Sequence, residues 1–348
     1  MNPLAGIIFH AIGGFASGSF YIPFKKVKNW AWESYWIVNG VVAWMLVPWI
    51  VGFLTVPNLL EVLLSAPKGS AFLCFFFGLL WGIGGLTFGL SMRYLGMSLG
   101  YAMALGYSAA FGTIVPPLYF GTFGTLASTT SGLVTLSGVG VCLAGIAVCG
   151  WAGISKEREM PDEAKKEIIS EFNFKKGLWV AFVCGIMSAC FAFGIVAGKP
   201  IAEQAAALGT RPLFVNNPAF IFIMFGGFVT NAIWCIMLNI KNRTGGDYIK
   251  RDTPLLGNYF FSAVAGTVWY MQFLFYGMGS TKMGEYDFSS WSIHMAFIIV
   301  FSNIWALIFR EWRGSSTKTV AKIIAGIGVL IVSTWVIGLG NYLASLGM

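Results

Sequence analysis

The sequence predicts an all-α integral membrane protein with ten transmembrane helices, arranged as two five-helix inverted repeats, with both termini on the outer side of the membrane. Three observations predict this fold. The chain is strongly apolar along its whole length, its basic residues alternate between successive connections, and its two halves begin with similar segments.

Apolar runs of membrane-spanning length recur from end to end. Hydrophobic residues make up 57% of the chain and charged residues 10%, whereas a soluble domain is about 25% charged. A helix needs roughly 20 apolar residues to cross about 30 Å of hydrocarbon. The ten expected spans cover residues 4–22, 34–54, 70–91, 97–120, 132–152, 177–198, 216–240, 255–279, 288–309 and 319–343.

The polar segments between these runs are short. No Lys or Arg precedes the first run, so we expect a retained helix there and not a signal peptide. The longest polar stretch, "SKEREMPDEAKKEIISEFNFKK", predicts a short amphipathic surface helix between the two halves. An extramembrane catalytic domain is not expected.

The basic residues predict the orientation. The net charge of +8 does not indicate nucleic-acid binding here, because Lys and Arg of multispanning proteins gather in cytoplasmic connections. Eighteen lie in odd-numbered connections and four in even-numbered ones, which places the odd connections in the cytoplasm. The four exceptions are Lys68, Lys199, Arg211 and Lys282. All six cysteines lie within apolar runs without a C-x-x-C pair, so neither a disulfide framework nor a metal site is expected.

An internal similarity divides the chain after the fifth expected helix. The segment "GIIFHAIGGFASGSF", residues 6–20, aligns without gaps on "GLWVAFVCGIMSACF", residues 177–191. A repeat with an odd number of spans enters the membrane from opposite sides in its two copies, which makes the repeat inverted. Such repeats place a substrate site near the bilayer midplane. The expected organisation is a first repeat at 1–155, a charged cytoplasmic linker at 156–176 and a second repeat at 177–348.

Few ionisable residues accompany the apolar runs, and each is a functional candidate because charge within a bilayer is costly. His10 lies in the first expected helix, His294 in the ninth, and Glu33 and Asp287 at helix mouths. On a helix Asp287, Trp291 and His294 share one face, since their spacing is i, i+4 and i+7. At 1.5 Å per residue His294 lies about 10 Å deeper than Asp287.

Gln272 lies about seven residues from the outer end of the eighth expected helix, so we expect it at a depth similar to that of the two histidines. Trp269, Phe273 and Tyr276 surround it in sequence. An amide beside aromatic rings suits a sugar, whose hydroxyls need hydrogen bonds and whose C–H faces lie against apolar rings. The alternative for each aromatic residue is packing or anchoring at the membrane interface.

His294 is a candidate proton carrier, because histidine exchanges its proton near neutral pH and a carboxylate such as Asp287 would favour the charged form. The alternative is a buried neutral histidine that bonds to a neighbouring helix. Glu33 either pairs with a lysine of the adjacent "KKVK" or releases a proton at the cytoplasmic side. Phosphate-binding loops, H-E-x-x-H and nucleophile elbows are absent from the sequence, so an enzyme is not expected.

Several motifs resemble those of the bacterial L-rhamnose/proton symporters, a family of the drug/metabolite transporter superfamily, over nearly the full length. The resemblance implies that His10, Glu33, Arg93, Lys199, Gln272, Asp287, Trp291 and His294 occupy positions that match the family. The chain differs at Gly85, where members often carry asparagine, and over 282–285. The motifs are "YIPFKKVKNWAWE" (21–33), "WGIGGLTFGLSMRYLGMSLG" (81–100), "FNFKKGL" (172–178), "AGKPIAEQAAALG" (197–209), "WYMQFLFYGMG" (269–279), "YDFSSWSIHM" (286–295) and "REW" (310–312).

The resemblance implies a multi-pass protein of the bacterial inner membrane, which imports L-rhamnose or a similar deoxy sugar with a proton. The bias in basic residues then predicts periplasmic termini, and the inverted repeat predicts alternating access. The resemblance implies no cofactor, and no obligate protein partner is evident. The alternatives are an exporter or exchanger of another small metabolite, or a membrane sugar sensor that moves nothing. Expected proton-coupling residues are His294, Asp287, His10 and Glu33, and expected sugar-binding residues are Gln272, Trp269, Tyr276 and Trp291.

Overall fold

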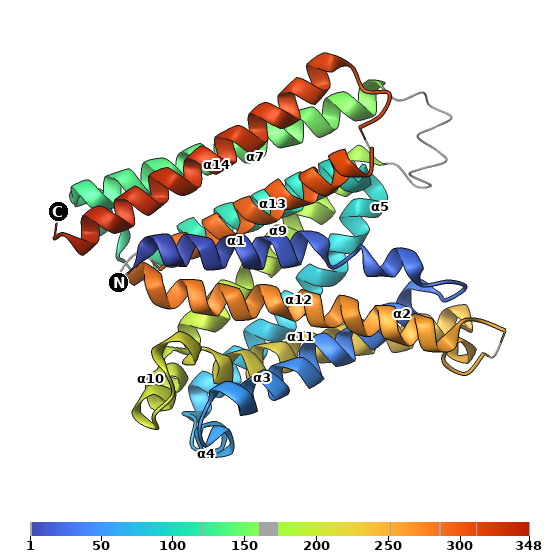
Figure 1. Ribbon diagram of the computed structural model, residues 1–348, viewed down its shortest axis with the longest axis horizontal. Helices are drawn as coiled ribbons and strands as arrows, with labels where there is room; N and C mark the ends of the chain where they lie inside the picture. The colour runs from blue at the N-terminus through green and yellow to red at the C-terminus, as the bar shows by residue number, and fades with distance from the viewer. Residues whose placement is uncertain are drawn as a thin grey trace. The chain divides into compact units, whose positions relative to one another are not determined.

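The computed structural model describes residues 2–119, 121–159, 173–250, 252–284, 287–310 and 312–347, and within these ranges all regular secondary structure is helical (Figure 1). This confirms the all-α class. The expected surface helix between the two halves, and with it most of the 156–176 linker, lies outside the described residues.

Short polar or Pro/Gly-containing turns separate the long apolar helices. The single-turn η elements are η1 (Pro23–Lys26), η3 (Pro212–Phe214) and η4 (Gly245–Tyr248), and η2 (Val41–Leu46) is a π-helix that joins α2 to α3. The α-helices are α1 (Pro3–Ser19), α2 (Trp32–Gly40), α3 (Val47–Thr55), α4 (Leu59–Leu64), α5 (Lys68–Tyr119), α6 (Phe123–Ser128), α7 (Thr130–Glu159), α9 (Phe174–Ala197), α10 (Lys199–Ala207), α11 (Asn217–Asn242), α12 (Leu255–Met283), α13 (Ser289–Ile308) and α14 (Thr317–Ser345).

Eight helical segments of the described chain are long and apolar enough to cross a membrane, which confirms an integral membrane protein. Of the two remaining expected spans, 255–279 is helical within α12, and the described part of 97–120, residues 97–119, is helical within α5. The eight segments are Pro3–Lys26, Trp32–Thr55, Lys68–Ser91, Thr130–Glu159, Lys175–Ala207, Pro212–Asn242, Ser289–Ile308 and Thr317–Ser345.

Helix α5 differs from the expectation, because the connection placed around Arg93 is helical. The segment from Ser91 to Gly100 contains no proline, so nothing in it removes a backbone hydrogen bond of the helix. At 1.5 Å per residue the 52 residues of α5 extend about 78 Å along the helix path, more than twice the thickness of the hydrocarbon core.

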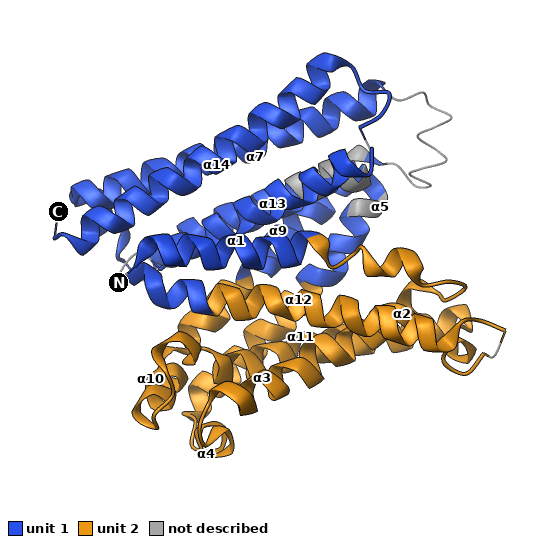
Figure 2. Cartoon of the chain, viewed as in Figure 1, with its two compact units in different colours: residues 1–18, 84–189, 278–348 blue, residues 19–83, 190–277 orange. Residues whose placement is uncertain are grey.

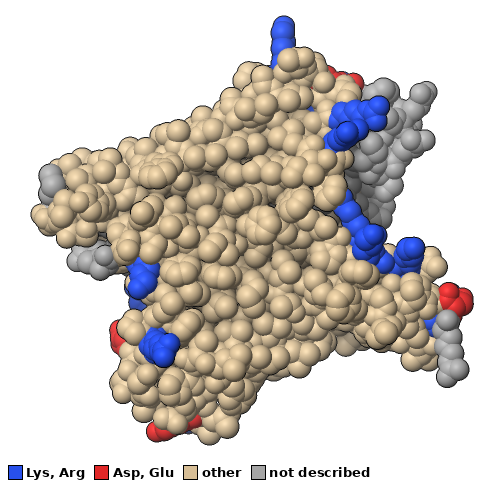
Figure 3. Space-filling model, viewed as in Figure 1, with Lys and Arg blue, Asp and Glu red and all other residues tan. Residues whose placement is uncertain are grey.

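The chain forms two compact units, and each contains segments of both sequence halves (Figure 2). Unit 1 comprises residues 1–18, 84–189 and 278–348, and unit 2 comprises residues 19–83 and 190–277. On the face drawn in Figure 3 the Lys, Arg, Asp and Glu side chains lie near helix ends, and the surface between them is uncharged, as expected of helices that meet hydrocarbon along their middle.

In unit 1, helices α7 and α14 pack as an antiparallel pair. A Cβ built at Gly138 would lie 2.8 Å from the backbone nitrogen of Ile337, and one built at Gly145 would lie 3.1 Å from that of Leu330. Gly138 precedes Gly145 along α7, whereas its contact Ile337 follows Leu330 along α14. The two helices therefore run in opposite directions. Small residues bring the backbones together here, as is typical of helix pairs in membranes.

Two aligned glycines of the internal similarity have the same packing role in unit 1. A Cβ at Gly14 would lie 2.4 Å from Cβ of Phe297, so α1 lies directly against α13. A Cβ at Gly185 would lie 2.2 Å from Cβ of Tyr107, so α9 lies directly against the second part of α5. Both glycines are therefore close-contact points between helices.

Unit 2 contains two close contacts of the same kind. A Cβ at Gly78 would lie 2.1 Å from the carbonyl oxygen of Ile223, which joins the first part of α5 to α11. A Cβ at Gly266 would lie 2.6 Å from the carbonyl oxygen of Asn39, which joins α12 to α2. Real Cβ atoms do not approach backbone this closely, so these positions require glycine.

We expect Gly78→Ala to destabilise the protein severely, because a methyl group there overlaps the backbone of α11 and overpacking commonly costs 1–3 kcal/mol or more. Gly140→Ala is the matched control, since a Cβ at Gly140 has nothing within 4 Å. Thermal unfolding of both variants in detergent checks this. Equal melting temperatures for the two variants would contradict the close packing of α5 on α11.

Candidate functional site

The structure brings the two histidines of the chain together within unit 1. The imidazole of His10 on α1 and that of His294 on α13 have ring centroids 6.0 Å apart, with planes inclined at 65°. The side chains are 0% and 1% exposed, respectively. A buried pair of imidazoles therefore lies where α1 and α13 pack against each other.

A glycine of α12 provides the space for this pair. A Cβ at Gly279 would lie 2.8 Å from both Cε1 and Nε2 of His10. Glycine therefore lets the backbone of α12 lie against the edge of the imidazole ring. Any side chain at this position would displace His10 and change its distance from His294.

Two neighbouring imidazoles are chemically suited to hold one proton. Either ring can take it, because neutral histidine has an acceptor nitrogen. A second proton would place two like charges a few ångströms apart in a buried environment, which is strongly disfavoured. The pair can therefore alternate between a neutral state and a singly charged state.

Asp287 lies before α13, so it is not on the helical face that the spacing predicted. The helix begins at Ser289, and Oδ1 of Asp287 accepts a hydrogen bond of 3.0 Å from the Ser290 hydroxyl. A carboxylate that bonds to a first-turn hydroxyl is favourably placed at a helix N-terminus, where the backbone N–H groups give a positive potential. The structure thus places Asp287 at the mouth of the helix that carries His294.

Trp291 packs α13 against the second part of α5 within unit 1. Its indole N–H donates to the carbonyl oxygen of Ser108 at 2.9 Å, and a Cβ at Gly112 would lie 2.4 Å from the indole ring. One residue further on, the hydroxyls of Ser292 and Thr113 lie 2.6 Å apart. These contacts fit the packing alternative for Trp291.

In unit 2, Trp269 lies at the centre of an aromatic cluster with Trp44, Trp81 and Phe273. Its ring centroid is 5.2 Å from that of Trp44, 5.4 Å from that of Trp81 and 4.8 Å from that of Phe273. The Trp44 contact is edge-to-face and the Trp81 contact is stacked. Four rings from α12, η2 and α5 therefore form one apolar surface.

Buried donors without a partner accompany the cluster. Gln272 is 5% exposed, and its Nε2 has no hydrogen-bond partner among the described residues. The indole nitrogen of Trp44 likewise has none within the described chain. A buried donor left unsatisfied costs about 1–3 kcal/mol, so these groups favour a ligand or water that can accept a hydrogen bond.

Tyr276 lies one helical turn beyond Gln272 on α12. It is buried, and its ring centroid is 6.4 Å from that of Phe191. Phe191 in turn contacts Phe273 at 4.6 Å. The structure therefore connects Tyr276 to the aromatic cluster through Phe191.

Glu33 is buried at the start of α2 and accepts two hydrogen bonds within unit 2. Its Oε1 accepts from Nδ2 of Asn242 at 2.9 Å and from the hydroxyl of Thr244 at 2.8 Å. In the described part of the chain no lysine forms an ion pair with it, so the expected partner among residues 25–28 is replaced by the C-terminal end of α11. The amide and hydroxyl reach Glu33 because α11 packs along α2.

Comparison with known proteins assigns the family. The family model for the L-rhamnose-proton symport protein matches residues 2–344. The chain belongs to this family. A relative named L-rhamnose-proton symporter from Yersinia pestis (strain Pestoides F) is 40% identical over 341 residues, which is 97% of this chain and 98% of the relative. One of the same name from Cronobacter sakazakii (strain ATCC BAA-894) is 41% identical over 339 residues, 96% of this chain and 97% of the relative.

The match confirms the resemblance seen in the motifs, and it makes the chain a member of a transporter family and not an enzyme. Among residues that contact the candidate site, sequence reasoning did not single out Gly279, Trp44 and Trp81. Gly279 stands in the segment "YGMGS", but it is one of 44 glycines in the chain. Only its contact with His10 in the folded protein distinguishes it from the others. Trp44 and Trp81 lie 225 and 188 residues before Trp269, so no local pattern connects them to it.

Proposed function

We propose that this protein imports L-rhamnose, or a closely similar deoxy sugar, together with a proton across the bacterial inner membrane by alternating access. The observation that carries the proposal is the buried His10–His294 pair, in a chain 40% identical over 97% of its length to a relative named L-rhamnose-proton symporter. A symporter needs a site that gains and loses one charge, and this pair has that chemistry.

The proton takes part through residues of unit 1 and the start of α2. His10 and His294 hold it, and Asp287 at the mouth of α13 favours its arrival. Glu33 is the candidate for its release, since it is buried in the first turn of α2, at the end of that helix which the bias in basic residues assigns to the cytoplasm. One charge that crosses 100 mV supplies about 2.3 kcal/mol, which concentrates a solute roughly fifty-fold at 1:1 coupling.

The sugar takes part through residues of unit 2, where Gln272 offers an unpartnered amide beside the aromatic cluster. Trp269 and Tyr276 supply apolar faces for the C–H groups of the sugar ring. A methyl-sized pocket discriminates by only about 1–3 kcal/mol, so recognition of the sugar depends on contacts with its hydroxyls. Trp291 belongs to unit 1 and its N–H is bonded to Ser108, so contact between Trp291 and the sugar rests on the sequence alone.

Ten spans in two inverted repeats remain our proposal for the architecture, and the glycine contacts support it. The expected helices are counted here in chain order. Gly14 joins the first to the ninth and Gly185 joins the sixth to the fourth, so exchange of the two five-helix copies converts one contact into the other. In the same way, Gly78 joins the third to the seventh and Gly266 joins the eighth to the second. The antiparallel pair α7–α14, the fifth and tenth helices, is its own counterpart. Periplasmic termini follow from the bias in basic residues.

Flux of labelled rhamnose into proteoliposomes under an imposed pH gradient tests the function. We expect accumulation above the outside concentration that collapses when a protonophore dissipates the gradient. Sugar-induced alkalinisation of the outer medium should accompany it, because a proton enters with each sugar. Binding without flux would instead indicate a sensor, and acidification of the medium would indicate an exporter or exchanger.

A further inference from the structure

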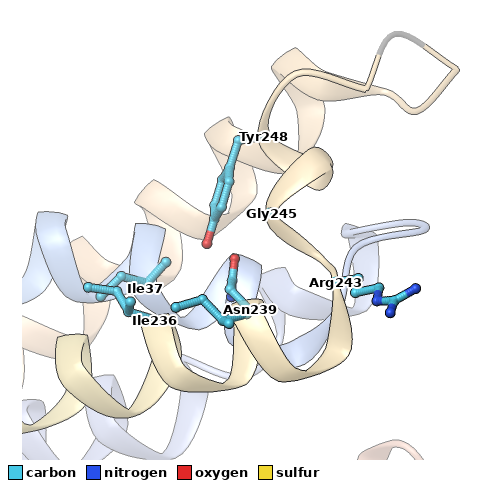
Figure 4. Close-up of a pocket in the computed structure, with 7 residues that line it drawn as sticks. Ile37, Ile236, Asn239, Arg243, Gly245 and Tyr248 are labelled. Carbon is cyan, nitrogen blue, oxygen red and sulfur yellow. The ribbon is translucent and has the colours of Figure 1, made fainter.

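A groove outside the proposed sugar and proton residues lies within unit 2, between α2 and the end of α11. It has a volume of about 410 Å³ and is lined by Ile37, Ile236, Asn239, Ile240, Arg243, Gly245 and Tyr248 (Figure 4). Segment η4 forms one wall, and Figure 4 shows the Tyr248 hydroxyl directed toward the isoleucines and Asn239. Three elements, α2, α11 and η4, therefore form the groove.

The groove has an apolar side and a polar end. Ile236 and Ile240 are 56% and 74% exposed, and both lie on the apolar span Pro212–Asn242, so this side meets hydrocarbon. Arg243 follows the last residue of that span, and Figure 4 shows its guanidinium pointing away from the groove interior. A ligand that uses both features must be elongated, with an apolar chain along the isoleucines and an anionic group at the arginine.

Two exposed basic residues lie at the polar end. Lys241 and Arg243 are exposed at the end of α11. Of the three nearby acids, Glu33 accepts from Asn242 and Thr244, on either side of Arg243. Asp247 accepts hydrogen bonds of 2.8 Å from the backbone nitrogen of Ala31 and the hydroxyl of Ser34. Asp252 lies 3.6 Å from the ammonium of Lys250. Each of these carboxylates therefore has a partner, whereas Lys241 and Arg243 are exposed and the only ion pair found in this part of the described chain is Lys250–Asp252. Both basic side chains can therefore meet an anionic group at the membrane surface.

The polar groups inside the groove are uncharged. Burial raises the pKa of Tyr248 above its ordinary value of 10.0, so the phenol keeps its proton at physiological pH. The amide of Asn239 donates to the carbonyl oxygen of Cys235 at 3.1 Å. A phenol and an amide oxygen suit the ester and glycerol region of a lipid, between its acyl chains and its phosphate.

We propose that this groove binds an anionic phospholipid of the leaflet that the basic connections face, with an acyl chain along Ile37, Ile236 and Ile240 and the phosphate at Arg243. Basic pockets between transmembrane helices bind such headgroups. A soluble anion would gain nothing from exposed isoleucines, and a zwitterionic lipid would gain little from the basic charge. A bound lipid would hold η4 against α2, the helix to which Asp247 and Glu33 already tie this region.

The test measures lipid binding to the full-length protein in detergent by native mass spectrometry. Dioleoyl phosphatidylglycerol and dioleoyl phosphatidylcholine are the probes, so only the headgroup differs. Arg243→Asn is the test variant, because Arg243 has φ of 57° and asparagine tolerates this conformation. Arg310→Asn is the matched control, since Arg310 is also exposed with φ of 56° and does not line the groove.

We expect Arg243→Asn to weaken binding of phosphatidylglycerol about fivefold, the effect of one basic residue near a membrane surface. Binding of phosphatidylcholine should weaken less, because its choline cation offsets the charge of the phosphate. Ile240→Asn, at an exposed position, should weaken binding of both lipids. Equal effects of the two arginine variants, equal affinity for the two lipids, or displacement of the lipid by glycerol phosphate alone would each overturn the proposal. The measurement needs neither sugar nor a pH gradient, so its outcome is independent of the proposed transport.

Discussion

Replacing His294 by glutamine should abolish proton-driven accumulation of rhamnose and preserve exchange of internal for external sugar. Glutamine is close to histidine in size and forms hydrogen bonds, but it cannot carry a proton. At 100 mV the ratio of internal to external rhamnose should fall from roughly fifty to about one. Exchange persists because it moves no net proton. Labelled rhamnose uptake and counterflow in the same proteoliposomes measure both quantities.

His10→Gln should give the same separation of accumulation from exchange, because the two rings lie 6.0 Å apart and are proposed to hold one proton between them. Met295→Leu is the control, since Met295 follows His294 on α13, is also buried and has no titratable group. Its uptake should equal that of the unaltered protein. Accumulation that survives in His294→Gln would show that the proton is carried elsewhere.

Replacing Gln272 by alanine should weaken rhamnose binding by about ten- to hundred-fold. The proposed physical reason is that the buried amide has no partner for Nε2 among the described residues and donates to a sugar hydroxyl. Loss of such a hydrogen bond from a desolvated site costs about 1–3 kcal/mol. Isothermal titration of purified protein with rhamnose measures the affinity directly, and proton coupling does not enter the measurement.

Gln204→Ala is the control for this prediction. Gln204 also belongs to unit 2, but it lies on the short helix α10 and donates to the hydroxyl of Ser65, near the surface. Its replacement should leave the affinity for rhamnose unchanged. If the two alanine variants bind rhamnose equally well, Gln272 does not contact the sugar, and the aromatic cluster around Trp269 is packing only.

Local patterns were sufficient for the membrane class and for most helix positions. An apolar run long enough to span a bilayer is helical because every backbone group must be satisfied within the segment, and this holds for 132–152 within α7 and 319–343 within α14. The same reasoning failed at Arg93, where a single charge suggested a connection. A lone arginine does not interrupt backbone hydrogen bonds, so the helix continues through it.

The site was predictable as residue types and less so as geometry. The sequence identified His10, His294 and Gln272 because polar side chains are rare in an apolar span. It identified Trp269 because several aromatic residues lie close together around Gln272. The partner of Glu33 was not predictable, since lysines beside it in sequence were nearer candidates than Asn242 and Thr244, some 210 residues later. Hydrogen-bond partners follow from which helices pack together, and periodicity within one helix contains no such information.

By itself the sequence determined that this protein lies in a membrane, that it is helical, which family it belongs to, and which few side chains are candidates for binding a proton or a sugar. These properties depend on composition, on the length of apolar runs and on motifs. Only the tertiary structure decided that His10 meets His294 against Gly279, that Trp44 and Trp81 surround Trp269, and that α2 and α11 leave a groove at Tyr248. The physical reason is that each arrangement depends on contact between helices more than 100 residues apart, and such contacts are set by glycine positions and side-chain volumes that act only once the helices pack.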